Sequence, residues 1–210
     1  MKRINRGKID IVIDSTGLKV FGEGEWQIRQ HGKTKVRSWR KIHIAINPET
    51  QEIEGCYVTA HGVQDCQGLP LVLNEIEGEI DKMIGEGAYA RFSCYEEMEK
   101  RGCRGIFPPQ RNGSTSEEHR KYKKGGISEN AILNRDKMIK EMRELGRAEW
   151  KVKMGYHKRS LAETAICRLK KILGTRLNSR ILENQQVEAK IKCNILNKMT
   201  ALGMPQSYSF

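Results

Sequence analysis

The chain has 210 residues, of which 30% are charged and 38% are hydrophobic, and its formal net charge at pH 7 is +12. This composition is typical of a folded globular protein and excludes an intrinsically disordered chain. The sequence has no apolar run of about 18 residues, which excludes a membrane-spanning helix. No apolar stretch follows its basic N-terminus, which excludes a signal peptide, so we expect a cytoplasmic protein.

The positive charge is unevenly distributed along the chain. Residues 1–41 carry 11 lysines and arginines against 4 acidic residues, whereas residues 42–109 carry 5 against 12. Residues 110–160 and 161–210 are basic again. A solvated surface is the alternative for any single cluster, but basic segments on both sides of an acidic one favour a surface that binds nucleic acid.

The six cysteines and five histidines show no spacing that is typical of a disulfide framework or a zinc site. No two cysteines form a Cys-x-x-Cys pair, and the histidines are dispersed. In a chain without a secretory signal, scattered cysteines indicate reduced thiols, and zinc needs ligands that are close together in the sequence. We therefore expect no disulfide and no zinc site.

The N-terminal third of the chain predicts strands. Three segments alternate apolar and polar residues or are rich in β-branched residues: residues 8–16, 40–50 and 52–60. The first of these strands is expected to end at Asp14, and the Gly-rich residues 17–35 predict a loop or a loose hairpin. A turn at Asn47-Pro48 separates the other two strands. These short connections indicate an antiparallel meander of three strands.

Helices and strands alternate in the next part of the chain. Apolar spacing near 3.6 residues predicts helices, and short apolar runs predict strands. The expected elements are a helix at residues 68–80, a strand at 82–87, a helix at 93–102 and a strand at 103–109. Residues 110–155 are polar and basic, with a helical stretch at residues 129–145, and indicate an inserted subdomain or a long linker.

Two helices are expected to close the chain. The first covers residues 160–173 and is ended by Gly174. The second covers residues 184–202 and places four apolar residues on one stripe, which we expect to pack in the core. These residues are Val187, Ile191, Ile195 and Met199.

This order of elements indicates the α/β class. Three antiparallel strands followed by alternating helices and strands favour a ribonuclease-H-like mixed sheet flanked by helices. Residues 110–155 then form a helical, basic insertion before the last two helices. We expect a single domain over residues 1–210.

Three carboxylates occupy positions at which such a fold brings acids together. Asp14 ends the first strand, Glu86 ends the fourth, and Glu163 lies in the first turn of the helix at residues 160–173. Clustered carboxylates bind Mg²⁺ or Mn²⁺, and two such ions cleave a phosphodiester bond by activating the attacking oxygen and stabilising the leaving one. Each acid also has a structural alternative. Asp14 could form an Asx turn, Glu86 could be an exposed surface acid, and Glu163 could form a capping box with Ser160.

The surroundings of Glu163 favour the metal-binding interpretation. Arg159 is four residues before it and Lys170 seven after it, so both fall near its face of the helix. Cations beside a carboxylate suit a site that holds a metal and a polyanion together. The hydroxyl of Tyr156 can donate a hydrogen bond to a phosphate, and its ring can stack.

The spacing Tyr-x2-Arg-x3-Glu-x6-Lys resembles the signature of bacterial insertion-sequence transposases of the DDE type. It is filled by Tyr156, Arg159, Glu163 and Lys170. Five segments, in the same order along the chain, are similar to the family named after insertion sequence five: residues 13–26, 39–47, 85–90, 158–165 and 197–205.

The resemblance implies a ribonuclease-H-like catalytic core that depends on Mg²⁺ or Mn²⁺ and cuts and joins DNA. The implied partners are transposon ends and target DNA, with a homo-oligomer left open, and the implied location is the cytoplasm, at the nucleoid. The implied catalytic and metal-binding acids are Asp14, Glu86 and Glu163. The implied DNA contacts are Tyr156, Arg159 and Lys170.

Two departures from the family pattern change the expected function. Glu86 replaces an aspartate, which moves the carboxylate by about 1.5 Å, and a second family aspartate is replaced by Ala90. A misplacement of about 1 Å costs on the order of 10²-fold in rate, so we expect an impaired catalyst. Asp14 also lies almost at the start, where the family carries an N-terminal end-binding region, so we expect that region to be absent.

Three interpretations of function therefore stay open. The first is a DDE transposase catalytic domain with impaired strand cleavage and strand transfer. The second is a catalytically inactive DNA-binding remnant of a transposase. The third is a ribonuclease-H-like nuclease of another kind, which the Tyr-Arg-Glu-Lys spacing argues against.

Overall fold

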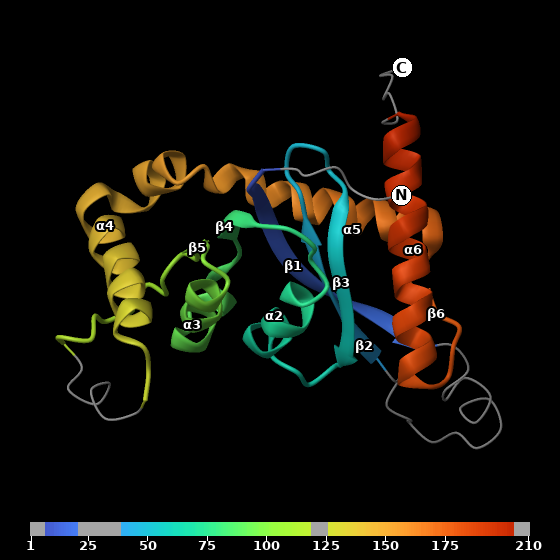
Figure 1. Ribbon diagram of the computed structural model, residues 1–210, viewed down its shortest axis with the longest axis horizontal. Helices are drawn as coiled ribbons and strands as arrows, with labels where there is room; N and C mark the ends of the chain where they lie inside the picture. The colour runs from blue at the N-terminus through green and yellow to red at the C-terminus, as the bar shows by residue number, and fades with distance from the viewer. Residues whose placement is uncertain (1–6, 21–38, 119–125, 204–210) are drawn as a thin grey trace.

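The computed structural model describes residues 7–20, 39–118 and 126–203 (Figure 1). In chain order the elements are β1 (Ile9–Val20), β2 (Trp39–Ile46), β3 (Ile53–Ala60), α2 (Asp65–Leu73), β4 (Ile80–Ile84), the 3₁₀ helix η1 (Gly87–Tyr89), α3 (Phe92–Lys100), β5 (Arg104–Ile106), α4 (Glu129–Lys153), the 3₁₀ helix η3 (Tyr156–Arg159), α5 (Ser160–Leu173), β6 (Arg176–Leu177) and α6 (Leu182–Leu202). Within these residues no helix is long and apolar enough to span a membrane.

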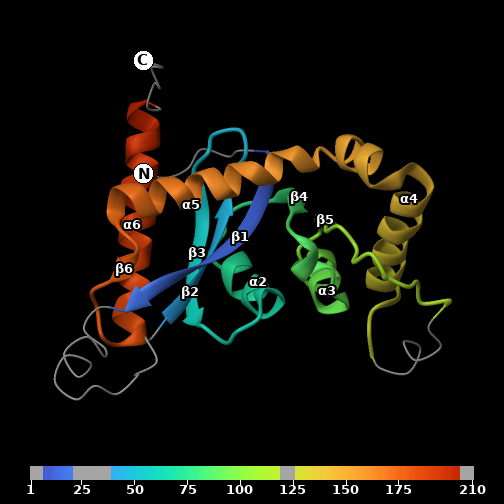
Figure 2. The same cartoon turned by 180° about the vertical axis from the view of Figure 1, so that it is seen from behind.

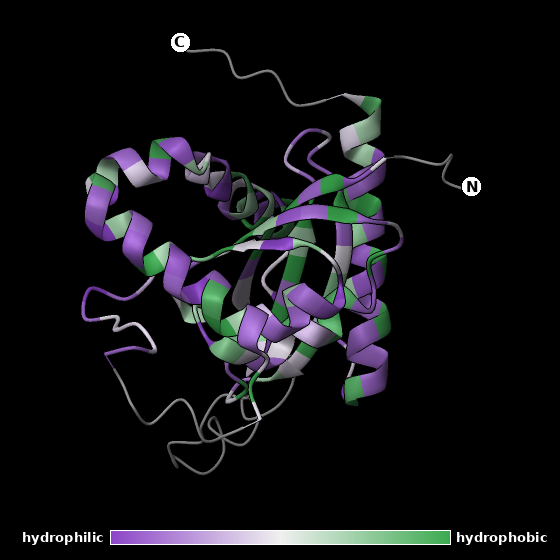
Figure 3. Ribbon diagram, turned by 60° about the vertical axis from the view of Figure 1, so that its left-hand side comes forward, coloured by the Kyte–Doolittle hydropathy of each residue, from purple (hydrophilic) through white to green (hydrophobic). Residues whose placement is uncertain are grey.

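The strands form one mixed sheet, as the order of elements predicted. The strand order is β3-β2-β1-β4-β5, and β6 pairs with β1. The first three strands are antiparallel, whereas β1 pairs with β4, and β4 with β5, in parallel. Hydrophobic residues gather on the strands, while α4 is largely hydrophilic (Figure 3). The α/β class and the ribonuclease-H-like mixed sheet flanked by helices are confirmed.

β1 is longer than predicted, so Asp14 lies within the strand and not at its end. Residues 17–19 continue the pairing with β2, residues 19 and 20 pair with β6, and Leu18 and Val20 are buried. Residues 17–20 of the expected loop are therefore strand, and its residues 21–35 lie outside the described residues. Alternation along the strand turns Asp14 and Ser15 to opposite faces of the sheet.

The two faces of the sheet are covered by different helices. α5 crosses one face, and α2 packs on the other (Figures 1 and 2). Lys170 of α5 donates a hydrogen bond to Thr16 on the first face. His43, the partner of Ser15 in the pairing of β1 and β2, lies against Gly68 of α2 on the second face. Alternate residues of β1 therefore face α5 and α2: Asp14 and Thr16 face α5, and Ser15 faces α2.

Two helices differ from the prediction in extent. α2 begins at Asp65 and ends at Leu73, with Asn74 as its C-cap, so it begins and ends earlier than the predicted helix at residues 68–80. α4 extends to Lys153, with a break at Gly146, whose φ is 74°. A positive φ is unfavourable for residues other than glycine, so Gly146 permits the break inside α4.

The prediction that the apolar stripe of α6 packs in the core is wrong. Its four residues, Val187, Ile191, Ile195 and Met199, are 39–55% exposed. The opposite face of α6 lies along the edge strand β3, where the side chains of Gln186 and Asn197 hydrogen-bond to the β3 backbone. The unpaired edge of the sheet requires these polar partners, which turns the stripe outward.

Replacing Gly68 by alanine is expected to lower the free energy of unfolding by about 1–3 kcal/mol, since it overpacks a fully buried contact. A Cβ atom at residue 68 would lie 2.3 Å from Cε1 of His43, whose ring is fully buried. Urea unfolding measures the change. Gly62→Ala is the control, because a Cβ atom there meets nothing within 4 Å. Equal stability of the two variants would contradict the tight packing of α2 on β2.

Candidate catalytic site

Two of the three predicted acids come from neighbouring parallel strands. Asp14 lies on β1, and Glu86 lies just beyond the end of β4, where it precedes η1. In the pairing of β1 and β4, Val12 is opposite Ile84. Continuing this register by two residues places Asp14 level with Glu86.

The third acid is brought to Asp14 by the start of α5. The guanidinium of Arg159 lies 3.5 Å from Oδ2 of Asp14 and donates two hydrogen bonds to Oε1 of Glu163, at 2.8 and 2.5 Å. One cation is therefore shared by carboxylates that are 149 residues apart in the sequence. The Asp14 side chain is 14% exposed and that of Glu163 is 58% exposed, so the pair extends from the sheet towards solvent.

An open cleft runs along α5 beside this pair. It has a volume of about 510 Å³, and its lining residues are Asp14, Ser15, Thr16, Glu163, Ile166, Cys167, Lys170, Lys171 and Thr175. The ammonium group of Lys170 is 2.6 Å from Oγ1 of Thr16, so α5 is fastened to β1 at both ends of the cleft. The cleft has acids at one end and lysines at the other. This arrangement suits a polyanion that contacts the lysines directly and the acids through metal cations.

The carboxylates of the site influence each other's protonation. Burial raises the pKa of Asp14, while the Ser15 amide and Arg159 oppose this and Glu163 adds to it. Burial also raises the pKa of Glu86, and the charges of Asp14 and Asp65 raise it further. Repulsion of this kind falls off with distance, so the acids from β1, α5 and the end of β4 belong to one electrostatic cluster.

The structural alternatives for two of the acids do not apply. Asp14 is part of a regular strand, and its Oδ1 accepts a hydrogen bond from the adjacent Ser15 amide, which is not an Asx turn. The capping box at α5 is absent, since the Ser160 hydroxyl donates to the carbonyl of His157 and Glu163 pairs with Arg159. η3 leads directly into α5, so the helix has no extended N-cap residue there.

Tyr156 begins η3, the 3₁₀ helix that leads into α5. The Tyr156 ring packs against Trp150, with 6.0 Å between the two ring centroids. The ammonium group of Lys151 lies 5.7 Å from the centroid of the Tyr156 ring. Burial raises the pKa of the Tyr156 hydroxyl, and Glu86 and Asp14 add to the effect. The four residues of the Tyr-Arg-Glu-Lys spacing therefore gather around Asp14 and the cleft.

The donor set suits a divalent cation in its chemistry. Carboxylate oxygens are the ligands that Mg²⁺ and Mn²⁺ prefer, and Arg159 already stands between Asp14 and Glu163 as a cation. Among residues 7–20, 39–118 and 126–203, however, no three His, Cys, Asp or Glu side chains are close enough to hold one metal ion. Asp14 and Glu163 share a cation as they stand, and they do not form such a three-ligand group with Glu86.

Sequence reasoning missed one acid of this cluster, Asp65. Its Oδ1 accepts hydrogen bonds from the Ser15 hydroxyl at 2.6 Å and from the Lys41 ammonium group at 3.1 Å. A helix start could have been recognised at Gln64, whose side chain forms a capping box with Gln67. Placing the helix start at residue 68 left Asp65 in a loop, without a structural reason to group it with Asp14.

Replacing Asp14 by asparagine is expected to increase the free energy of unfolding at pH 7, because burial raises the pKa of the Asp14 carboxyl above 3.8 in the folded protein. Such a group contributes stability fully below its unfolded-state pKa, and this contribution is lost as the pH rises through the folded-state pKa. Asparagine does not titrate, so the two proteins should converge in stability below the unfolded-state pKa of 3.8, at about pH 3. Urea unfolding at both pH values tests this, and a variant less stable than wild type at pH 7 would contradict it.

One comparison with known proteins bears on this arrangement. A family model described as "Transposase DDE domain" matches residues 5–198. The matched range includes every predicted site residue and every helix and strand up to the last turns of α6.

Proposed function

The chain belongs to the family of transposase DDE domains, whose activity is DNA transposition, and on this premise we propose that it cleaves and joins DNA strands with Asp14, Glu86 and Glu163 as its catalytic acids. The observation that carries the proposal is the sharing of Arg159 by Asp14 and Glu163. Glu86, just beyond the end of the neighbouring strand β4, is the proposed third acid. The family named after insertion sequence five is the proposed subgroup.

The three acids would hold Mg²⁺ or Mn²⁺. When bound, these ions lower the pKa of the attacking water or 3′-hydroxyl and stabilise the leaving oxygen. Arg159 and Lys170 bind phosphate groups of the DNA, since Lys170 lines the cleft and Arg159 contacts two acids that line it. The planar guanidinium of Arg159 can contact two phosphate oxygens at once, and Tyr156 supports the same strand with its ring or hydroxyl.

The proposed organisation is one ribonuclease-H-like domain over residues 1–210, with residues 110–155 as its insertion. The described part of this insertion packs through α4 onto α3. The proposed partners are transposon ends and target DNA, in keeping with the net charge of +12. A homo-oligomer and a place at the nucleoid belong to the same proposal.

Impaired catalysis is part of the proposal. Glu86 has one methylene more than the aspartate of the family pattern, and Ala90 offers no acid nearby. A second candidate function, a DNA-binding remnant without turnover, is favoured by the same two residues. Both candidates bind DNA through phosphate groups, so binding alone does not separate them.

A strand-nicking assay on supercoiled DNA separates the two. The enzyme is expected to nick DNA with Mn²⁺, more slowly with Mg²⁺, and not with a chelator. DNA binding should fall steeply with rising salt in both cases, because each phosphate contact releases counterions. Salt-dependent binding without nicking under any metal condition would identify the inactive remnant.

A further inference from the structure

Asp65 joins three segments of the chain at the start of α2. Its Oδ1 accepts hydrogen bonds from the hydroxyl of Ser15 on β1 and from the ammonium group of Lys41 on β2. Lys41 also donates to the carbonyl of Val63 at 2.8 Å. The Asp65 side chain is 17% exposed, so these partners hold a largely buried charge. Hydrogen bonds to a charged group of this kind restrain both partners strongly.

The restraint reaches Asp14 through one residue. Ser15 follows Asp14 in β1, and its amide donates a hydrogen bond to Oδ1 of Asp14 at 2.8 Å. Asp65 fixes the Ser15 side chain on the α2 face, while the Ser15 backbone fixes the Asp14 carboxylate on the α5 face. The orientation of Asp14 therefore depends on a contact on the opposite side of the sheet.

Tyr89 carries a buried hydroxyl that the charges of the same acids influence. The side chain of Tyr89 is fully buried, and within the described part of the chain its hydroxyl has no hydrogen-bond partner. Burial raises the pKa of this hydroxyl, and the charges of Asp65, Asp14 and Glu86 add to the effect, in that order.

We propose that Asp65 is a positioning residue of the divalent-cation site, which it supports by fixing Asp14 through Ser15 and by adding negative charge beside Asp14 and Glu86. This inference rests on the proposed function, because it assumes that the acids hold Mn²⁺ or Mg²⁺. Outer residues that orient the ligands of a metal typically change its affinity by 10- to 100-fold when they are replaced. Asp65 acts through its neighbours and takes no part in bond cleavage.

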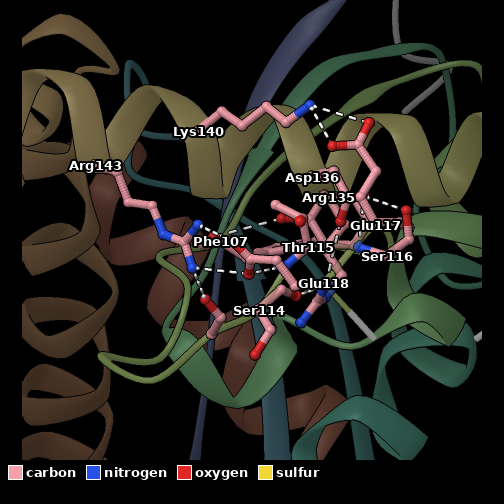
Figure 4. A network of polar contacts seen from close by, with 12 residues as sticks. Phe107, Ser114, Thr115, Ser116, Glu117, Glu118, Arg135, Asp136, Lys140 and Arg143 are labelled. Carbon is pink, nitrogen blue, oxygen red and sulfur yellow. Dashed lines mark hydrogen bonds and ion pairs between the residues drawn. The ribbon is translucent and has the colours of Figure 1, made fainter. Parts of the chain in front are cut away.

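The chain offers a matched control in Asp136 of α4. Asp136 is also buried, accepts hydrogen bonds from the Ser116 hydroxyl and amide, and lies 3.4 Å from Arg135 (Figure 4). It thus combines a hydroxyl partner and a cation partner, as Asp65 does. It lies in a network that fastens residues 113–118 to α4, away from the cleft.

The test measures Mn²⁺ affinity from the electron paramagnetic resonance signal of free Mn²⁺, with the full chain and without DNA. Asp65→Asn keeps the size of the side chain and loses its charge, and we expect roughly 10-fold weaker Mn²⁺ binding. Ser15→Ala removes the link to Asp14 and should weaken binding in the same direction. Asp65→Glu should recover part of the affinity, and Asp136→Asn should leave it within about twofold of wild type.

The outcomes separate this inference from the proposed function. If Asp65→Asn and Ser15→Ala bind Mn²⁺ as tightly as wild type while Asp14→Asn binds weakly, Asp65 is only structural and the inference fails alone. If Asp136→Asn weakens binding as much as Asp65→Asn, general destabilisation explains the loss and the inference also fails. If the wild type binds no Mn²⁺, the metal-dependent function fails, and this inference fails with it. If Asp65→Asn does not fold, the Mn²⁺ affinity of Ser15→Ala is compared with that of Ser116→Ala. These variants remove the hydroxyl that donates to Asp65 and the one that donates to Asp136, respectively.

Discussion

Glu86→Asp is expected to increase the rate of DNA strand nicking by on the order of 10²-fold over wild type, because a shift of about 1 Å in a catalytic group costs about this much. The wild-type carboxylate is carried by a side chain one methylene longer than the family pattern has at this position. Shortening it restores the ligand position that Mg²⁺ requires, since Mg²⁺ accepts little distortion of its octahedral geometry. Single-turnover nicking of supercoiled DNA with Mg²⁺ and with Mn²⁺ measures the effect.

Two controls make the result specific to residue 86. Glu79→Asp shortens an acidic side chain just before β4, away from the acids, and should leave the rate unchanged. Glu86→Gln keeps the length but removes the charge, and should abolish nicking. A Glu86→Asp variant that nicks no faster than wild type would show that the position of this carboxylate does not limit the reaction.

Glu163→Gln is expected to reduce nicking to the level of the chelator control, a loss of at least about 10²-fold, since it removes one charged ligand from a site that works by electrostatic stabilisation. Of the two acids that Arg159 contacts, Asp14 and Glu163, the substitution leaves only Asp14 charged. DNA binding should be retained or become slightly tighter, because the substitution removes a negative charge from the cleft. The assay therefore compares nicking rate and binding affinity on the same variant.

Glu183→Gln is the matched control for this change. Glu183 occupies the first turn of α6, as Glu163 occupies the first turn of α5, and both are exposed. Both substitutions neutralise an acid near a helix N-terminus, so their effects on helix stability should be similar. A loss of activity in both variants would indicate a general effect of helix charge, and full activity in Glu163→Gln would remove Glu163 from the site.

Most of the fold follows from local signals in the sequence. The turn at Asn47-Pro48 and the end of α5 at Gly174 were predictable, because proline fixes its own φ and glycine can adopt the positive φ, 84° here, that ends a helix. The strands of the meander were predictable from alternation. Local signals did not reveal that β1 continues past Gly17, because that extension depends on pairing with β2 and β6.

The orientation of α6 shows a limit of periodicity. The helix has two faces with helical spacing, one with Val187 and Ile191 and the other with Ala189 and Cys193. Hydrophobicity favours burial of the first face, but the second is buried. Its neighbours Gln186 and Asn197 bond the open edge of β3, and this requirement is visible only once the edge strand is known.

The site was only partly predictable for a related reason. The spacing of Tyr156, Arg159, Glu163 and Lys170 identifies one helix face, and the structure brings that face to Asp14. The contact of Asp65 with Ser15 crosses from α2 to β1 over 50 residues. No periodic signal links these two residues, so only the packing of α2 on the sheet reveals the contact.

The most direct test of the account is the position of Mn²⁺ in crystals of the protein, located by anomalous diffraction at saturating Mn²⁺. The account predicts a peak in the cleft between β1 and α5, bonded to carboxylate oxygens of Asp14 and Glu163, with the Arg159 guanidinium displaced from between them. A fully loaded crystal in which Arg159 still bridges the two acids, and in which Mn²⁺ binds only elsewhere on the surface, would contradict it.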